Sequence, residues 1–307
     1  MTVVLDSQCI WGDVMKQKMS ILFSLLIIFV VPLCSEPWLA TIDANLTLTQ
    51  NVYSNNWAGS ESGSISWAAS MNSRAEKQLS SRLHNKNELR LAYGQTYNQD
   101  AETNEWSDAN TSTDLIDFES IVRLTLGAFV DPYASGRIET QFVDETDPDN
   151  DRWINPVLFT ESIGAAKVFL KDDVRELTSR FGVAVRQNVN RDVLDTLTLL
   201  RKTQTTNDAG LIFYTDFTTP IAEERLTYTS KLSVFKAFYS SESSTREGLP
   251  NEDYWKHPDI NWENTLVACI TSLVVVNLYV QLLYDKEIDT GVRFKETLGL
   301  GLTYKLP

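Results

Sequence analysis

Eight charged residues occupy alternating positions in segments with the pattern of β-strands, so they would project from one side of a sheet. They are Glu88, Arg90, Asp117, Glu119, Arg123, Glu176, Arg180 and Arg186. Both signs of charge occur on successive segments, and two kinds of chemistry fit such a set. Around an open channel the charges would form a selective constriction. In a narrow interior they would pair and hold it shut.

A second candidate is the acidic stretch DETDPDND, residues 144–151. Acids at alternating positions resemble the way in which a calcium loop places its oxygen ligands. The glycine expected after Asp151 is absent, because Arg152 and Trp153 follow. A solvated acidic loop therefore fits this stretch better than a metal site.

Catalytic chemistry has little to build on, because the chain contains only two histidines, His84 and His257. We expect His84 in an inner turn and His257 in an outer loop, away from the membrane-facing wall that a barrel phospholipase would use. A protease at the outer rim, with His257 beside nearby acids, is a weaker alternative. No zinc cluster, phosphate loop or redox pair occurs. The sequence predicts no enzyme, no metal site and no cofactor.

About twelve strands are available to position the charged residues. They are expected at residues 38–52, 65–71, 89–97, 116–126, 138–143, 158–168, 177–185, 209–217, 226–238, 262–270, 274–284 and 292–306. Apolar residues alternate with polar or small ones, the period of two of a strand with two different faces. Over residues 158–168 the pattern does not decide which face points inward. An even number of strands suits a closed bacterial barrel. The predicted fold class is all-β, a transmembrane antiparallel up-and-down β-barrel.

The connections between these strands alternate in length. Longer, polar connections are expected on the outside at residues 53–63, 98–113, 144–156, 188–207, 239–261 and 286–291, and mostly shorter ones on the inside at 77–86, 128–136, 169–174, 218–225 and 271–273. This is the pattern of outer-membrane barrels.

Residues 192–202 fit either a short helix or a strand end. Three aromatic residues close the loop 239–261, namely Tyr254, Trp255 and Trp262; they would anchor in the membrane interface, or else bind a glycan or a partner.

The last hairpin makes a detailed prediction. A loop centred on Asp289 would place Tyr284 opposite Phe294 and Tyr279 opposite Gly299, with one continuously apolar face. Glu296 falls on that apolar face. In the final strand, alternate positions are apolar and Gly299 lies on the polar side. Four residues have the spacing that marks a closing strand for the barrel-assembly machinery: Thr297, Gly299, Leu302 and Tyr304.

Composition agrees with a barrel in contact with outer-membrane lipid. Hydrophobic residues make up 43% of the 307 residues and charged residues 22%, which is too polar for a bundle of membrane helices. The formal charge of −14 argues against nucleic-acid binding, which needs clustered Lys and Arg.

Residues 1–35 are predicted to be a signal peptide with Met15 as the true start, because Lys16 and Lys18 precede a short apolar run. A lipid-modified Cys34 is the less favoured alternative. Residues 36–307 would be the mature barrel, and with only Cys269 left it would have no internal disulfide.

Four motifs resemble a bacterial family of unknown function whose members are predicted outer-membrane barrels. They are NWAGSES at residues 56–62, DINWE at 259–263, LLYDKEI at 282–288 and FKETLGLGLTYKL at 294–306. The resemblance runs from about residue 50 to the end and is clearest in the last fifty residues. It implies an outer-membrane location and no established activity. The leading functional hypothesis is a narrow pore for small solutes. The alternative is a non-transporting surface or scaffold barrel that binds a partner through its extracellular loops.

Overall fold

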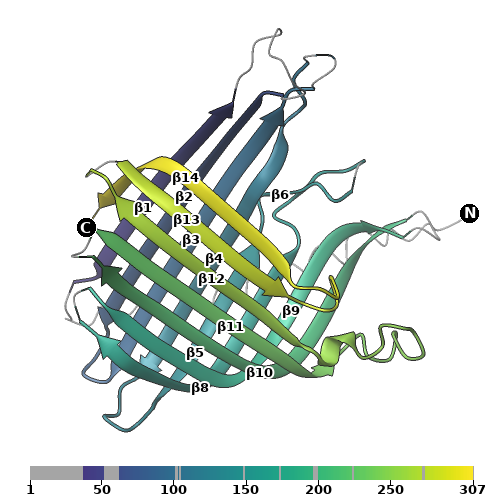
Figure 1. Cartoon of the computed structure of the whole chain (residues 1–307). Helices are drawn as coiled ribbons and strands as arrows, with labels where there is room; N and C mark the ends of the chain where they lie inside the picture. The colour runs from purple at the N-terminus through teal and green to yellow at the C-terminus, as the bar shows by residue number, and fades with distance from the viewer. Residues whose placement is uncertain are drawn as a thin grey trace, which may run out of the picture. The chain divides into compact units, whose positions relative to one another are not determined.

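The computed structural model describes residues 37–51, 62–100, 103, 105–147, 149–172, 174–195, 200–222, 225–271 and 274–306. Residues from Pro37 onwards form one compact unit, and this unit is a closed β-barrel (Figure 1). The predicted signal peptide, residues 1–35, and the proposed start at Met15 lie outside the described residues. Cys269 is an exposed free thiol.

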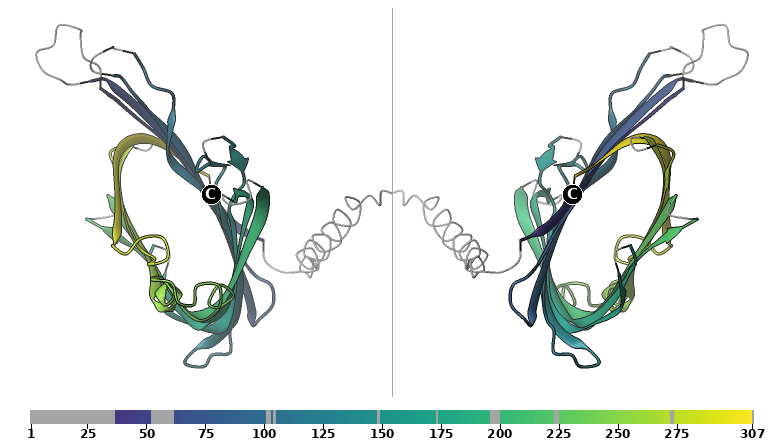
Figure 2. Two further views of the ribbon diagram at one scale, coloured as in Figure 1. Left: turned by 90° about the vertical axis from the view of Figure 1, so that its right-hand side faces the viewer. Right: turned by 90° about the vertical axis from the view of Figure 1, so that its left-hand side faces the viewer.

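The barrel contains twelve antiparallel strands, as the sequence predicts, and β14 closes the ring on β1 (Figure 2). The strands are β1 (Leu39–Asn51), β2 (Ser64–Gln78), β3 (Leu83–Asn98), β4 (Asn110–Leu124), β5 (Asp131–Thr140), β8 (Val157–Lys171), β9 (Glu176–Leu194), β10 (Arg201–Ile221), β11 (Leu226–Ser240), β12 (Pro258–Cys269), β13 (Val274–Tyr284) and β14 (Arg293–Leu306). Outside the ring, β6 (Val143–Asp144) pairs with β7 (Arg152–Trp153), and η1 (Tyr254–Lys256) is a single 3₁₀ turn.

The alternation in the sequence becomes an apolar outside and a polar inside. On β9, Phe181 and Val183 are exposed on the outer face, whereas Arg180 and Ala184 on either side of them are buried. The undecided face of residues 158–168 is also settled, because Thr160 and Ser162 are buried while Ile163 is exposed. The reversal of the usual soluble pattern is what a strand between lipid and a polar lumen requires.

Three predicted connections differ from the structure. The inner connection expected at residues 128–136 lies earlier, because β5 spans Asp131–Thr140 and not the expected 138–143. Residues 188–207, expected to be an outer loop, mostly continue β9 and β10 as paired strands, and the connection lies between Leu194 and Arg201. The outer parts of β9 and β10 form a two-stranded ribbon that carries polar side chains, and such a segment looks like a loop in the sequence. Gln187 and Asn207 are one pair, and their side chains hydrogen bond at 2.9 Å. Within residues 192–202, the first three belong to β9 and the last two to β10, and residues 196–199 lie outside the described residues. At the inner end β3 begins at Leu83, so His84 lies in a strand and not in a turn.

The last hairpin has the predicted face and a different register. Leu282 lies opposite Phe294, and Leu278 lies opposite Leu298. The predicted pairs of Tyr284 with Phe294 and of Tyr279 with Gly299 are therefore wrong by two residues. A helical turn between β13 and β14, closed by a 3.0 Å hydrogen bond from the N–H of Asp289 to the carbonyl of Asp285, centres the loop one residue earlier. A shift of two preserves parity, so the apolar face stays outside.

A pair of facing glycines marks the closest approach of two neighbouring strands. Gly164 on β8 lies opposite Gly182 on β9. A Cβ atom added at Gly182 would lie 2.1 Å from the carbonyl oxygen of Ile163, and one at Gly164 would lie 2.1 Å from that of Phe181. Only residues without a side chain fit at this pair.

Replacing Gly182 by valine is therefore expected to impair barrel formation, at a cost of at least about 1–3 kcal/mol for overpacking. The measurement is the fraction of protein that migrates as the compact, heat-modifiable form in an unboiled gel. Gly136→Val on β5 is the matched control, because an added Cβ there meets nothing within 4 Å. Equal folding of the two variants would contradict the prediction.

Candidate functional site

All eight predicted charged residues take part in ion pairs. The pairs are Glu88 with Lys86 and Lys231, Arg90 with Asp117 and Glu263, Glu119 with Arg180, Arg180 with Asp216, Glu176 with Arg74 and Lys86, Arg186 with Asp259, and Arg123 with Asp131. The structure thus brings most of the set into one interior network. Arg123 stands apart, because its nearest acid, 3.9 Å away, belongs to the neighbouring strand β5.

Three of these contacts join walls that lie far apart in the ring. Nζ of Lys231 on β11 lies 2.9 Å from Glu88 on β3, and these strands are six positions apart, the largest separation that twelve strands allow. Arg90 on β3 reaches Glu263 on β12 at 2.7 Å. Arg74 on β2 reaches Glu176 on β9 at 2.8 Å. We call these three contacts the cross-lumen pairs; they span the lumen with side chains alone.

The sequence reasoning missed several partners in this network, among them Lys231, Glu263 and Arg137. Arg137 donates to Asp117 at 2.8 Å, so that carboxylate is held between two guanidinium groups. A signal for these residues existed. Lys231 and Glu263 lie on the polar side of the predicted strands 226–238 and 262–270, next to apolar or aromatic residues that point outward.

The space left among these side chains is small. A cavity of about 40 Å³ lies in the middle of the lumen and is lined by charged and polar groups, including Glu88, Arg90, Arg180, Lys231 and Glu263. A water molecule needs roughly 10–15 Å³ measured in this way. The cavity therefore has room for only a few water molecules between these side chains.

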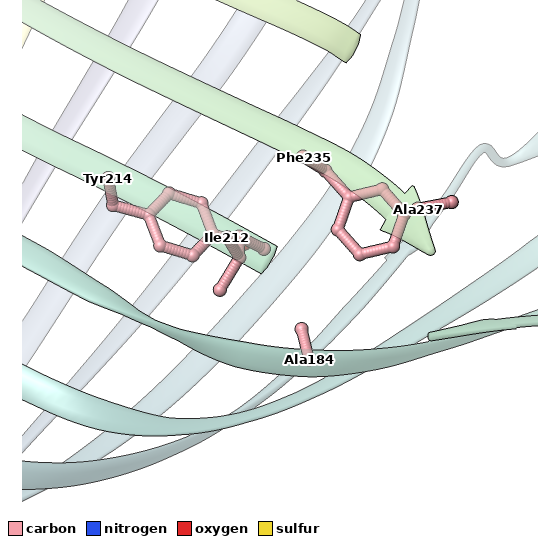
Figure 3. Packing of buried hydrophobic residues seen from close by; sticks show 5 residues of the cluster. All are labelled: Ala184, Ile212, Tyr214, Phe235 and Ala237. Carbon is pink, nitrogen blue, oxygen red and sulfur yellow. The ribbon is translucent and has the colours of Figure 1, made fainter. Parts of the chain in front are cut away.

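An apolar cluster lines one wall of the lumen towards its outer end. Inward-pointing apolar side chains from β9, β10 and β11 gather there: Ala184, Ile212, Tyr214, Phe235 and Ala237 (Figure 3). Trp255 of the 241–257 loop packs against this cluster. The guanidinium of Arg186 lies 3.8 Å from the centre of the Phe235 ring. The prediction that Trp255 anchors in the membrane interface is wrong, because it covers the apolar cluster instead.

Loop contacts hold this cover in place. Arg246 pairs with Glu287 of the connection between β13 and β14. Nζ of Lys286 lies 3.0 Å from Nε2 of His257 and 4.7 Å from the ring centre of Tyr254. Tyr254 and His257 therefore serve contacts between two loops. At the other end of the barrel, Nε2 of His84 lies 3.6 Å from Glu76.

The predicted acidic loop belongs to a structured lobe, residues 141–156, which we call the extracellular lobe. Asp144, 2% exposed, pairs with Arg152 at 2.7 Å and accepts a 2.8 Å hydrogen bond from Asn155, which is fully buried. Asn155 also donates to Asn190 of β9. Burial alone would raise the pKa of Asp144, but hydrogen bonds from Thr146 and Asn155 and the charge of Arg152 outweigh burial and lower it. The described acids of the chain form no cluster of three that could hold a metal ion.

The extracellular lobe is anchored where β5 is short. The ladder between β4 and β5 ends at the pair of Ile116 and Thr140, while β4 continues towards Asn110. Beyond that point the carboxylate of Asp114 accepts the backbone N–H groups of Phe142 and Val143, at 2.6 and 2.9 Å. The chain after β5 is thus tied to β4 by side chains instead of a strand ladder; Thr111 of β4 also donates to Glu145 at 3.2 Å.

The outer surface carries exposed large apolar residues around the whole ring. They include Leu46, Leu48, Ile163, Phe181, Val183, Val185, Leu211, Phe238, Leu298, Leu300 and Leu302. Two hydrogen-bonded polar pairs lie among them. The indole N–H of Trp262 donates to Ser230 at 3.0 Å, and the hydroxyl of Tyr228 donates to Asn264 at 2.7 Å. Such pairing is what hydrocarbon demands of a polar group. Among the described residues no helix is long and apolar enough to cross a membrane.

A closed antiparallel barrel with an apolar exterior and a charged interior defines this protein as an outer-membrane-type β-barrel in contact with lipid. Residues 48–145 match a family model described as "Protein of unknown function (DUF3078)". The predicted resemblance to a family of unknown function is confirmed for this segment, which includes the first motif, residues 56–62. The match does not include the last fifty residues, where the resemblance was expected to be clearest.

Three solved structures illustrate what the chain is similar to. The translocator domain of the autotransporter NalP from Neisseria meningitidis is 9% identical, with 97% of each chain covered and a TM-score of 0.37. The COG4313 outer membrane channel from Pseudomonas putida F1 is 15% identical, with 90% of this chain and 98% of that chain covered and a TM-score of 0.40. The transport unit of the autotransporter AIDA-I from Escherichia coli is 9% identical, with 93% and 96% covered and a TM-score of 0.27. No curated protein matches the sequence.

Proposed function

We propose that the protein is a surface barrel of the bacterial outer membrane whose lumen is closed by its own side chains and whose extracellular lobe is presented to a binding partner. The observation that carries the proposal is the contact between Lys231 and Glu88, which joins opposite walls of the ring at 2.9 Å. A side-chain bridge across the full width of the lumen obstructs diffusion through it. This favours the non-transporting alternative over an open pore.

The ordered extracellular lobe supports the second half of the proposal. Its buried polar network, built from Asp144, Arg152 and Asn155, fixes the shape of the lobe. Rigid surfaces lose less conformational entropy on binding than mobile loops do. The proposal gives the protein no enzymatic activity and needs no cofactor. It keeps β14 as the segment that the barrel-assembly machinery recognises.

The test is the conductance of the purified, unmodified protein in planar lipid bilayers. We expect no resolvable single-channel steps at moderate voltage. A protein without the extracellular lobe, with residues 142–155 replaced by a short Gly/Ser linker, should be equally silent if the lobe serves binding. Stable open steps from the unmodified protein would overturn the proposal in favour of the narrow pore, for which the charged lumen would be the selective constriction.

A further inference from the structure

The seam between the first and last strands is only half closed. β1 and β14 pair over six residues, from Ile42 with Leu306 to Thr47 with Gly301. Towards the outer side, residues 48–51 of β1 are paired only with β2. Residues 293–300 of β14 are paired only with β13. No backbone hydrogen bond joins these two described segments to each other. In Figure 2, the strands β1 and β2 continue away from β14 beyond the ring.

The open part of the seam lies at the level of the lipid. Leu48 on β1 and Leu298 and Leu300 on β14 point outward and are 61%, 65% and 60% exposed. In hydrocarbon, each unsatisfied backbone group costs several kcal/mol, and irregular backbone is tolerated only where it lines a polar opening or is covered by protein. The seam must therefore be occupied, and it connects the bilayer with the lumen.

The lumen side of the seam carries two basic residues without an acidic partner. Arg293 and Lys295 share the inward face of β14 with Gly299. Arg293 makes no ion pair with any described residue, and its buried Nε has no hydrogen-bond partner among them. Nζ of Lys295 contacts only neutral oxygens of β4, the carbonyl of Ser112 at 3.3 Å and the hydroxyl of Thr113 at 3.2 Å.

These two cations differ from the basic residues in the middle of the lumen. The chain carries a formal charge of −14, and the basic residues in the middle of the lumen are matched with carboxylates, as Arg90 and Lys231 show. Two unmatched cations beside each other are complementary to an anionic group with several oxygens.

We propose that the outer half of the β1–β14 seam is a lateral binding site for an anionic amphiphile from the bilayer. Its acyl chain lies outside against Leu48, Leu298 and Leu300. Its carboxylate or phosphate head passes between the strands and binds Arg293 and Lys295. The site lies above the cross-lumen pairs, so it does not require a conducting lumen, and its test is independent of the conductance measurement.

The probe is a nitroxide-labelled long-chain fatty acid, with its uncharged methyl ester and a phosphate monoester of the same chain as comparisons. Binding to the full chain in zwitterionic vesicles is measured by the motionally restricted fraction of the spin-label spectrum. We expect both anionic probes to bind and the ester to bind at least about tenfold more weakly, since each charge-assisted hydrogen bond is worth about 1.5–3 kcal/mol. Free inorganic phosphate should not displace the fatty acid, because it lacks the chain.

Two variants locate the site. Arg293→Gln with Lys295→Gln should weaken fatty-acid binding at least about tenfold, whereas Arg82→Gln, at an exposed inner turn, should leave it unchanged. In a Cys269→Ser background, Leu48→Cys with Leu300→Cys should form a disulfide across the seam on oxidation, lose binding, and regain it on reduction. Heat-modifiable migration of each variant shows that the barrel is intact.

Three outcomes would overturn the proposal. The first is equal binding of acid and ester. The second is unchanged binding after the basic residues are replaced or the seam is cross-linked. The third is a disulfide-linked dimer of the single Leu300→Cys variant in the same Cys269→Ser background, formed in place of fatty-acid binding, because it would assign the strand edge to a second copy of the chain.

Discussion

Replacing Glu88, Arg90, Lys231 and Glu263 together by serine is expected to turn an electrically silent barrel into one that passes ions. The four substitutions remove two cross-lumen pairs and equal numbers of positive and negative charges. Removing both partners of a buried pair avoids the penalty of about 3–5 kcal/mol for leaving one charge unpaired. Serine is small, so water enters the space that the long side chains vacate.

Single-channel recording in planar bilayers measures the effect, and we expect discrete steps where the unmodified protein shows none. The matched control is Arg123→Ser with Asp131→Ser, a pair of the same chemistry between the neighbouring strands β4 and β5. Heat-modifiable migration shows that each variant is folded. A folded four-serine variant that stays silent would mean that the remaining contacts, the pair of Arg74 and Glu176 and the apolar cover with Trp255, close the lumen without the other two pairs.

The second large effect is expected in the extracellular lobe. Asp144→Ala leaves the buried guanidinium of Arg152 without its carboxylate partner, and removing one member of a buried pair costs about 3–5 kcal/mol. The lobe should open while the barrel stays folded, because its contacts with the ring are made at the outer ends of β4, β9 and β10. Limited trypsin digestion followed by mass spectrometry should then detect cleavage after Arg152, which is protected in the unmodified protein.

Asp149→Ala is the control for this experiment, because Asp149 is an exposed acid in the same loop. The lowered pKa of Asp144 adds a dependence on pH. Its carboxylate stabilises the lobe fully above the ordinary aspartate pKa of about 3.9, and this contribution is lost as the pH falls through the lower value in the folded lobe. Pepsin should therefore cut the lobe only in strong acid. Equal cleavage of Asp144→Ala and Asp149→Ala would contradict the role given to the buried pair.

The fold could be predicted from the sequence because one physical pattern governs it. A strand between lipid and a polar lumen must alternate, and the alternation of Leu298, Leu300 and Leu302 with Gly299 and Gly301 is visible without a structure. The same parity placed Arg90 and Arg180 inside. The register of the last hairpin was harder to predict. A shift of two residues changes every cross-strand pair but leaves each side chain on the same face of the sheet. The helical turn after Tyr284 decided it.

The partners within the lumen could not be predicted in the same way. Parity gives the side of the wall but not the opposite wall, so nothing in the sequence joins Lys231 to Glu88, 143 positions away. The polar residues 188–207 misled for a related reason. Where a strand extends beyond the membrane, its side chains no longer alternate between lipid and a polar lumen. Its sequence then resembles that of a loop, although its backbone stays paired.

That ribbon has a consequence for how the cell surface meets this protein. β10 is 21 residues long, about twice the 9–11 residues that suffice to cross a bilayer. Roughly 30 Å of strand, at about 3.3 Å per residue, is left over as a stalk. Whatever approaches from the medium, whether an antibody, a phage or a neighbouring cell, would meet this stalk before it met the headgroup layer.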